Sequence, residues 1–174
     1  MLFTPHSVVG ATIGILTGNP ILGFFSGMGA HFLLDALPHV DQSSFYFTEN
    51  KGAIWAGAKF DEEGFNNQKN GFLQNKRDWI LLGLDVILAG SLVLLIMSSV
   101  PQNQAAVIFG ALGGVAPDLI DVTPFWKKAF RRTAFGKAFH KLHHFLHWPL
   151  PARKWPLGFG IQLAIVLICL LLIK

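Results

Sequence analysis

Residues 156–173 read PLGFGIQLAIVLICLLLI, a run that contains no charged side chain. At about 1.5 Å per residue, an α-helix over this run is about as long as the hydrocarbon core of a bilayer is thick. Two further segments have the same apolar character: 78–100, which is interrupted by Asp85, and 104–122, which carries two aspartates near its end. All three segments therefore predict membrane-spanning helices.

The N-terminal apolar region predicts a hairpin of two helices, over 5–17 and 21–37. The Gly-Asn-Pro sequence at 18–20 separates them, because such residues favour a turn and break a helix. The first helix is only marginally long enough to cross a bilayer. Together the five segments predict an all-α fold, an integral membrane helical bundle with four to five membrane helices, formed as a single domain over 1–174.

The composition excludes several other classes of protein. Of the 174 residues, 52% are hydrophobic and 14% are charged, whereas soluble domains carry about 25% charged residues. The 16 Phe and 5 Trp exclude a disordered chain. The single cysteine, Cys169, excludes a disulfide scaffold and lies in an apolar run. The net charge of +4 is explained by basic loops, so no nucleic-acid partner is expected.

Two long polar segments, 38–77 and 123–155, connect the predicted helices. The second has no acidic residue and contains eight basic residues: Lys127, Lys128, Arg131, Arg132, Lys137, Lys141, Arg153 and Lys154. The short connections on the opposite side carry no charge. The positive-inside rule therefore predicts a multi-pass protein of the inner cell membrane, with both long loops in the cytoplasm and a basic, partly helical loop at 123–155.

This topology assigns the ionisable residues in or beside the predicted spans to one side of the membrane. The residues concerned are His6, His31, Asp35, His39, Asp41, Asp78, Asp85, Asp118, Asp121, His140, His143, His144 and His147. Such residues are costly in a membrane segment, and they usually face a cavity or one another. Their concentration on one side indicates a functional site at the cytoplasmic interface.

The spacing of these residues is that of shared helix faces. His31 and Asp35 are four residues apart, and Asp118 and Asp121 are three apart, so each pair lies on one face of its helix. A helix over 140–147 would place its four histidines in one stripe. Imidazole nitrogen and carboxylate oxygen are ligands of divalent metals. The pattern predicts a metal site, with zinc as the expected ion and manganese as the alternative.

Some of these residues could have a structural role in place of metal binding. His39 and Asp41 could cap the end of a helix, and about two of the four histidines at 140–147 are expected to bind the metal. Asp85 could pair with an arginine or a histidine inside the bundle. A set of glycines is expected to allow close helix packing: Gly10, Gly14, Gly23, Gly27, Gly29, Gly110, Gly113 and Gly114.

Three short motifs give the chain a family resemblance. They are Thr4-Pro5-His6 followed by Gly10, His31-Phe-Leu-Leu-Asp35 followed by Pro38-His39, and Pro117-Asp118-Leu-Ile-Asp121. Together they resemble motifs of the predicted membrane-bound metal-dependent hydrolases, the YdjM-like group. The stretch 31–39 is also similar to a stretch of zinc-dependent phospholipase C and P1-type nuclease, which are all-helical phosphodiesterases with a zinc cluster.

The resemblance implies site residues at His6, His31, Asp35, Asp118, Asp121, His140 and His144. The expected metal ligands are His6, His31, Asp35, His39, Asp118, His140 and His144. Asp121 or Asp85 is expected to act as the general base or to orient a histidine.

We therefore expect a membrane-embedded, metal-dependent hydrolase that acts at the cytoplasmic interface on a phosphoester of a lipid or lipid-linked substrate. Membrane lipid and that substrate are the expected partners. The assignment as a hydrolase rests on the resemblance, whereas the metal site rests on the residues. The alternative is a non-catalytic, transporter-like protein that handles metal ions or protons through its intramembrane aspartates.

Overall fold

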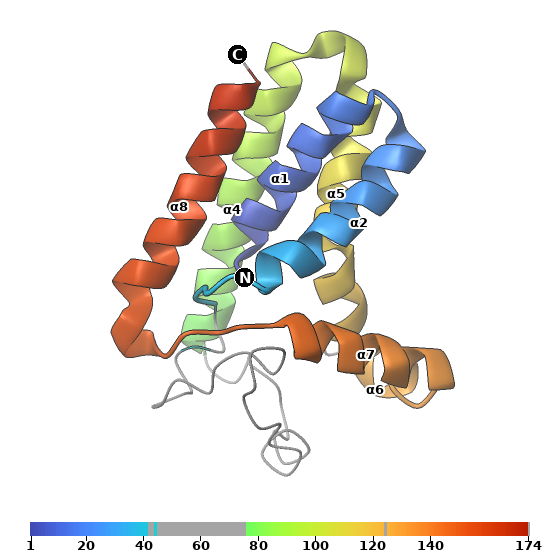
Figure 1. Cartoon of the computed structure of the whole chain (residues 1–174), viewed down its shortest axis with the longest axis vertical. Helices are drawn as coiled ribbons and strands as arrows, with labels where there is room; N and C mark the ends of the chain where they lie inside the picture. Colours follow the sequence, from blue (N-terminus) through green and yellow to red (C-terminus); the bar gives the residue numbers. More distant parts are fainter. Residues whose placement is uncertain (42–43, 45–75, 124, 174) are drawn as a thin grey trace.

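The computed structural model describes residues 1–41, 44, 76–123 and 125–173. These residues form helices and no strand, which confirms the predicted all-α fold. The helices are α1 (Phe3–Thr17), α2 (Pro20–Asp35), α4 (Lys76–Ser99), α5 (Gln104–Asp121), α6 (Lys127–Phe130), α7 (Ala134–Leu146) and α8 (Trp155–Leu172), with 3-10 helices at Pro101–Asn103 and Ala152–Lys154 (Figure 1). Most of the predicted polar loop at 38–77 lies outside the described residues.

Three of the described helical segments are long and apolar enough to cross a membrane, as expected of a membrane protein. They are Lys76–Ser99, Pro101–Asp121 and Trp155–Leu172, and they correspond to the three apolar segments identified in the sequence. The helices α1 and α2 have 15 and 16 residues, fewer than the about 20 residues of a typical span. The structure thus supports three spans, and the larger count of four to five stays a prediction.

Glycines bring α1, α2 and α5 into close contact. A Cβ atom added at Gly10 would collide with the carbonyl oxygen of Gly110, and one added at Gly113 would collide with the carbonyl oxygen of Phe24. Similar close approaches occur at Gly14, Gly27 and Gly114, and a less close one occurs at Gly23, where an added Cβ would lie 3.2 Å from the carbonyl oxygen of Ala106. The prediction of close packing is wrong for Gly29, where an added Cβ would have no heavy atom within 4 Å. At these glycines the backbones of neighbouring helices touch directly, with no side chain between them. The helices α1, α2 and α5 therefore pack as one closely associated group.

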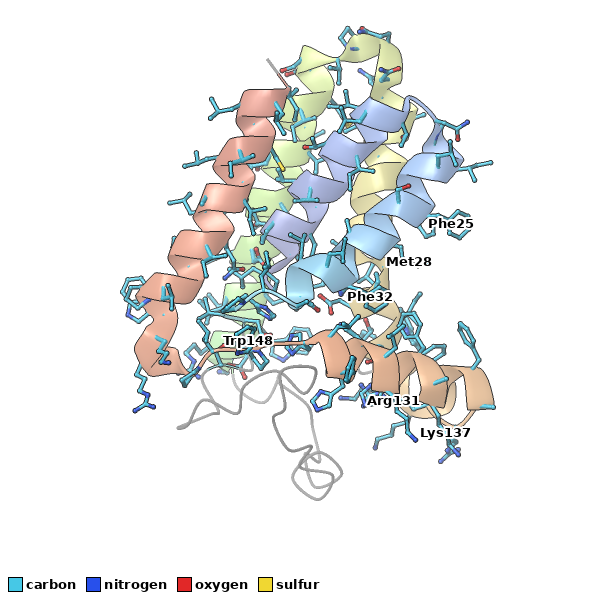
Figure 2. All side chains as sticks on the ribbon, in the orientation of Figure 1. Phe25, Met28, Phe32, Arg131, Lys137 and Trp148 are labelled. Carbon is cyan, nitrogen blue, oxygen red and sulfur yellow. The ribbon has the colours of Figure 1, made fainter. Side chains whose placement is uncertain are left out.

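The helices α4 and α8 pack on the outside of α1 and are more exposed than α5. Half of the apolar window of α5 is buried (50%), compared with 17% in α4 and 22% in α8. Their exposed side chains are large and apolar, and Phe25 of α2 also points outward (Figure 2). Because such surfaces are stable in lipid and not in water, this exposure fits helices in a bilayer.

The bundle has two different ends (Figure 1). The N-terminus, the end of α2, the start of α4, the end of α5 and the start of α8 lie at one end, and α7 runs across it. The opposite end holds the α1–α2 turn, where Gly18 adopts a left-handed conformation with φ of 59°. There the Asn19 side chain accepts hydrogen bonds from the backbone nitrogens of Ile21 and Leu22, capping α2.

Candidate metal centre

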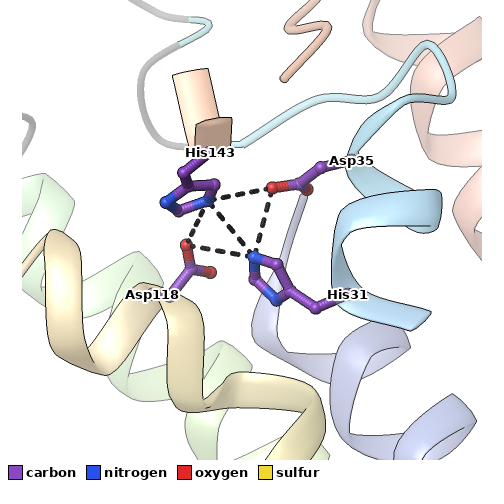
Figure 3. A group of neighbouring side chains, drawn as sticks. All are labelled: His31, Asp35, Asp118 and His143. Carbon is purple, nitrogen blue, oxygen red and sulfur yellow. Dashed lines mark hydrogen bonds and ion pairs between the residues drawn. The ribbon is translucent and has the colours of Figure 1, made fainter. Parts of the chain in front are cut away.

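Four side chains from three helices meet at the end of the bundle that α7 crosses. His31 and Asp35 come from the last turns of α2, Asp118 from the end of α5 and His143 from α7. One ligand atom from each residue lies within 4.8 Å of every other (Figure 3). His31, Asp35 and His143 are buried, and Asp118 is partly exposed. We call these four residues the first group.

Five of the six separations between ligand atoms of the first group are close to the edges of a tetrahedron around a metal ion. His31 Nε2 lies 3.3 Å from Asp35 Oδ2 and 3.7 Å from Asp118 Oδ1. His143 Nε2 lies 3.2 Å from Asp35 Oδ2 and 3.4 Å from Asp118 Oδ1. The two Nε2 atoms are 3.2 Å apart. Ligands at about 2.0–2.1 Å from a tetrahedral zinc ion stand about 3.3 Å from one another, so this spacing suits such an ion.

The other ring nitrogen of each histidine is held by an oxygen atom. His31 Nδ1 lies 2.7 Å from the carbonyl oxygen of Gly114, which can only accept a hydrogen bond. His143 Nδ1 lies 3.2 Å from Asp121 Oδ2. In the neutral ring with its proton on Nδ1, Nε2 carries the lone pair and is directed into the first group. This is the arrangement usual for metal-binding histidines.

Asp121 lies behind His143, outside the first group. Arg131 Nε donates a hydrogen bond of 2.9 Å to Asp121 Oδ1, and Arg131 Nη2 donates one of 2.7 Å to the Asp121 carbonyl oxygen. His140 Nδ1 lies 2.6 Å from Asp121 Oδ2. The Asp121 carboxylate is therefore positioned to orient His143.

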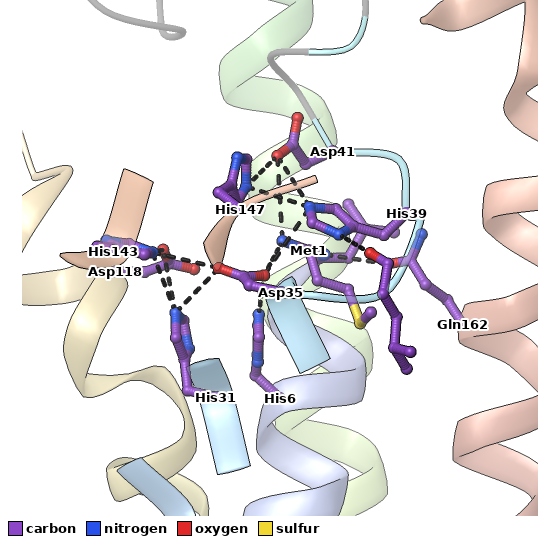
Figure 4. A network of polar contacts seen from close by, with 12 residues as sticks. Met1, His6, His31, Asp35, His39, Asp41, Asp118, His143, His147 and Gln162 are labelled. Carbon is purple, nitrogen blue, oxygen red and sulfur yellow. Dashed lines mark hydrogen bonds and ion pairs between the residues drawn. The ribbon is translucent and has the colours of Figure 1, made fainter. Parts of the chain in front are cut away.

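A second group consists of Asp35, His39 and His147, whose ligand atoms also lie within 4.8 Å of one another (Figure 4). The Nε2 atoms of His39 and His147 are 3.1 Å apart. Asp41 Oδ2 lies 3.0 Å from His147 Nε2 and 3.6 Å from His39 Nε2. His39 Nδ1 donates to the carbonyl oxygen of Leu37 at 2.8 Å, which leaves Nε2 for the second group.

Backbone hydrogen bonds align the two segments that carry the second group. The Trp148 nitrogen donates to the carbonyl oxygen of Asp35 at 2.9 Å, and the Leu150 nitrogen donates to that of His39 at 2.7 Å. The His39 nitrogen donates in turn to the carbonyl oxygen of Trp148 at 3.2 Å. The chain leaving α7 is thereby held beside the chain leaving α2, which places His147 beside His39.

The carboxylate of Asp35 belongs to both groups, and its two oxygens face different neighbours. Oδ2 faces the first group, whereas Oδ1 lies 3.8 Å from His39 Nε2 and 3.2 Å from His6 Nε2. Oδ1 also lies 2.7 Å from the α-amino nitrogen of Met1. His6 is buried and stacks on His31 at a centroid distance of 3.9 Å. A carboxylate in this position can bridge two ions.

The local charges favour a cation in the first group and a neutral imidazole in the second. Burial alone lowers the pKa of His143, but hydrogen bonds to Asp121 and Asp35 outweigh burial and raise that pKa to about 10. Burial and the positive charge of the Met1 amino group lower the pKa of His39 to about 4. A neutral imidazole is the form that binds a metal, so an ion that binds His143 displaces a proton from its ring.

The two groups contain some of the predicted ligands and omit others. His31, Asp35, Asp118 and His39 belong to them, and His6 lies beside Asp35. His140 contacts Asp121, and His144 stacks on His140 at a centroid distance of 6.3 Å. His143 and His147 take part instead, although the expected ligand set did not include them. The stripe of histidines was the available signal, but its spacing does not define how the helix is rotated toward the site.

Asp85, a residue of α4, contacts the start of α1 and belongs to neither group. Its carboxylate accepts hydrogen bonds from the backbone nitrogens of Phe3 at 2.6 Å and Thr4 at 3.1 Å, and from the Thr4 hydroxyl at 2.6 Å. An acidic side chain that accepts from the first backbone nitrogens of a helix stabilises that helix end. The structure therefore gives Asp85 a capping position in the bundle.

Comparison with protein-family models, with curated proteins and with solved structures found no match for this chain.

Proposed function

We propose that this chain is a membrane-embedded, metal-dependent hydrolase that acts on a phosphoester of a lipid or lipid-linked substrate. The observation that carries the proposal is the first group: two imidazoles and two carboxylates with the spacing of a tetrahedral zinc site. In this reading the three long helices cross the inner membrane, and the site lies at its cytoplasmic face. The basic segment at 123–155 supports that orientation.

The two groups suit a pair of ions that share Asp35. In that arrangement His31, Asp118 and His143 complete the first ion site, and His39, His147 and Asp41 complete the second. Asp121 and Arg131 hold the His143 ring in place from behind. Partners of this kind set the orientation and basicity of a metal-binding histidine.

Hydrolysis of a phosphoester fits this set of residues. Divalent ions bound there would polarise a phosphoryl oxygen and lower the pKa of a bound water to about 7. In the overall reaction a bond forms between the water oxygen and phosphorus, the bond from phosphorus to the alcohol oxygen breaks, and a proton ends on the alcohol. Asp118 is the most exposed member of the first group, with 15% of its side chain accessible, and it marks the side from which a substrate would enter.

Metal analysis of the full chain, purified in detergent, is the first test. We expect two zinc or manganese ions per chain, and loss of the ion of the first group in a His31→Gln/Asp118→Asn variant. Asn19→Ala, at the opposite end of the bundle, is the matched control and should keep both ions. Metal-loaded protein should then release alcohol or phosphate from lipid phosphoesters, and the double variant should not.

Two outcomes would contradict the proposal. Folded protein that binds no zinc or manganese would remove the metal site. Metal-loaded protein that hydrolyses no phosphoester but carries the ion into sealed vesicles would support the metal-handling alternative instead.

A further inference from the structure

The helix α7 faces the candidate site on one side and is exposed on another. His143 and His147 point to the two groups, and Phe139 packs on Phe32 of α2 at a centroid distance of 5.8 Å. Away from these contacts, Phe135 and Leu142 are 70% and 48% exposed. An exposed apolar face on a helix that is already anchored by its other face indicates a further contact surface.

Basic side chains occupy another exposed face of α7. Lys137 and Lys141 are four residues apart on α7 and both are exposed. Figure 2 shows Lys137 on the side of α7 that faces away from the bundle. The segment before α7 has the same character, because Phe125 is 83% exposed and Trp126 is 48% exposed. No acidic residue occurs anywhere in 123–155.

The position of α7 brings this surface to the level of a bilayer interface. The helix runs crosswise at the end of the bundle where α4 and α8 begin and α5 ends (Figure 1). If those three helices cross the membrane, α7 lies near the headgroups of one leaflet. A helix with large apolar residues on one face and lysines on another is typical of helices that lie in the plane of a membrane surface.

We propose that the exposed surface of α7, together with the exposed aromatic residues that precede α6, docks on an anionic lipid leaflet of the membrane that holds the bundle. We call it the docking surface and define it by Phe125, Trp126, Phe135, Lys137, Lys141 and Leu142. Its positive charge complements anionic headgroups, and each lysine near such a surface strengthens binding about fivefold. The helix α7 packs against α2 and α5 at the end of the bundle where the spanning helices begin or end, which favours lipid over an acidic protein as the partner.

Docking has a consequence for the site, and this step rests on the proposed function. The same helix carries His143 of the first group, and His147 of the second group follows directly after its last residue, Leu146. Contact with the leaflet therefore holds both histidines where the ions require them, because an ordered ligand loses less freedom on binding. Anionic lipid is then a partner of the enzyme and a determinant of its metal affinity.

The test compares the full chain in nanodiscs of phosphatidylcholine alone with nanodiscs of an equal mixture of phosphatidylcholine and phosphatidylglycerol. Hydrogen–deuterium exchange of the α7 amides reports docking, and zinc titration reports the site. We expect slower α7 exchange and tighter zinc binding in the anionic nanodiscs. In Lys137→Gln/Lys141→Gln the protection of α7 should fall about 25-fold. Arg153→Gln/Lys154→Gln removes the same charge outside α7 and should retain the protection.

The two readouts separate failure of the docking surface from failure of the proposed function. Equal α7 exchange in both lipids overturns the docking proposal, even if zinc binds. Protection that is the same in both lipids but rises with protein concentration also overturns it, because the surface then contacts a second protein. Lipid-dependent protection in a chain that binds no zinc supports docking and contradicts the proposed function.

Discussion

The two ends of the bundle are built from different residues. The end that α7 crosses holds two groups of histidines and aspartates, centred on the buried carboxylate of Asp35. The opposite end holds the turn around Asn19 and the short helix Pro101–Asn103. The segments 7–30 and 86–117, which lead to that end, contain no histidine, lysine, arginine, aspartate or glutamate.

The residues that pack the helices together are therefore different from the ionisable residues of the candidate site. The glycine contacts of α1, α2 and α5 and the apolar exteriors of α4 and α8 suffice for a helical bundle in a membrane. Buried ionic groups are weak evidence for stability, because removing them from water offsets much of their mutual attraction. Their restriction to one end is consistent with the proposed metal site.

The largest expected effect is on Asp35, which the two groups share. Asp35→Asn removes the charge and one carboxylate oxygen from both groups, so we expect zinc affinity to fall more than about 100-fold at both sites, beyond the range for partners behind a ligand. Equilibrium dialysis with zinc measures this. Retention of either ion at its original affinity would show that Asp35 is not shared.

The sequence predicts much of this end of the molecule because short-range helix geometry determines it. His31 and Asp35 share a face of α2 whatever the tertiary structure, and Pro38 ends the helix in time to bring His39 back toward it. The choice among the four histidines at 140–147 depends on how α7 is rotated. The Asp121 and Phe32 contacts determine that rotation, and both are distant in sequence.

Asp85 is a second case in which a contact distant in sequence could not be predicted from the local pattern. Its position inside an apolar helix is a sequence signal for function or for an internal partner. Its partners are the backbone nitrogens of Phe3 and Thr4, about eighty residues away, which no local pattern identifies. Similarly, the apolar character of α1 predicts a membrane helix, whereas its close packing on α5 depends on facing glycines in both helices.

The next effect sharpens the role of Asp121. Asp121→Asn keeps a side chain of the same shape but weakens the contact that orients His143, so zinc affinity at the first group should fall about 10- to 100-fold. The second group does not include Asp121 and should retain its ion. A titration that resolves the two sites checks this, and equal loss at both sites would contradict the separation of the groups.

The middle of the bundle should respond in stability and not in metal binding. Gly110→Ala places a methyl group against the carbonyl oxygen of Gly10, and we expect it to destabilise the protein by about 1–3 kcal/mol. Gly90→Ala is the matched control, because an added Cβ there has no heavy atom within 4 Å. Unfolding in mixed micelles should distinguish the two. If both variants were equally stable, the three-helix contact would not be as close as described.

The smallest expected effects compare one helix cap at each end. Asp85→Asn weakens the cap of α1, and Asn19→Ala removes the cap of α2, so each should lower stability by about 1 kcal/mol. Both variants should retain zinc with unchanged affinity, because neither side chain belongs to the two groups. Loss of hydrolysis in Asp85→Asn, with zinc retained and folding intact, would instead give Asp85 a part in the reaction. Asn19→Ala should remain active in that case. The residues needed for hydrolysis would then include Asp85 of α4 in addition to the proposed metal ligands.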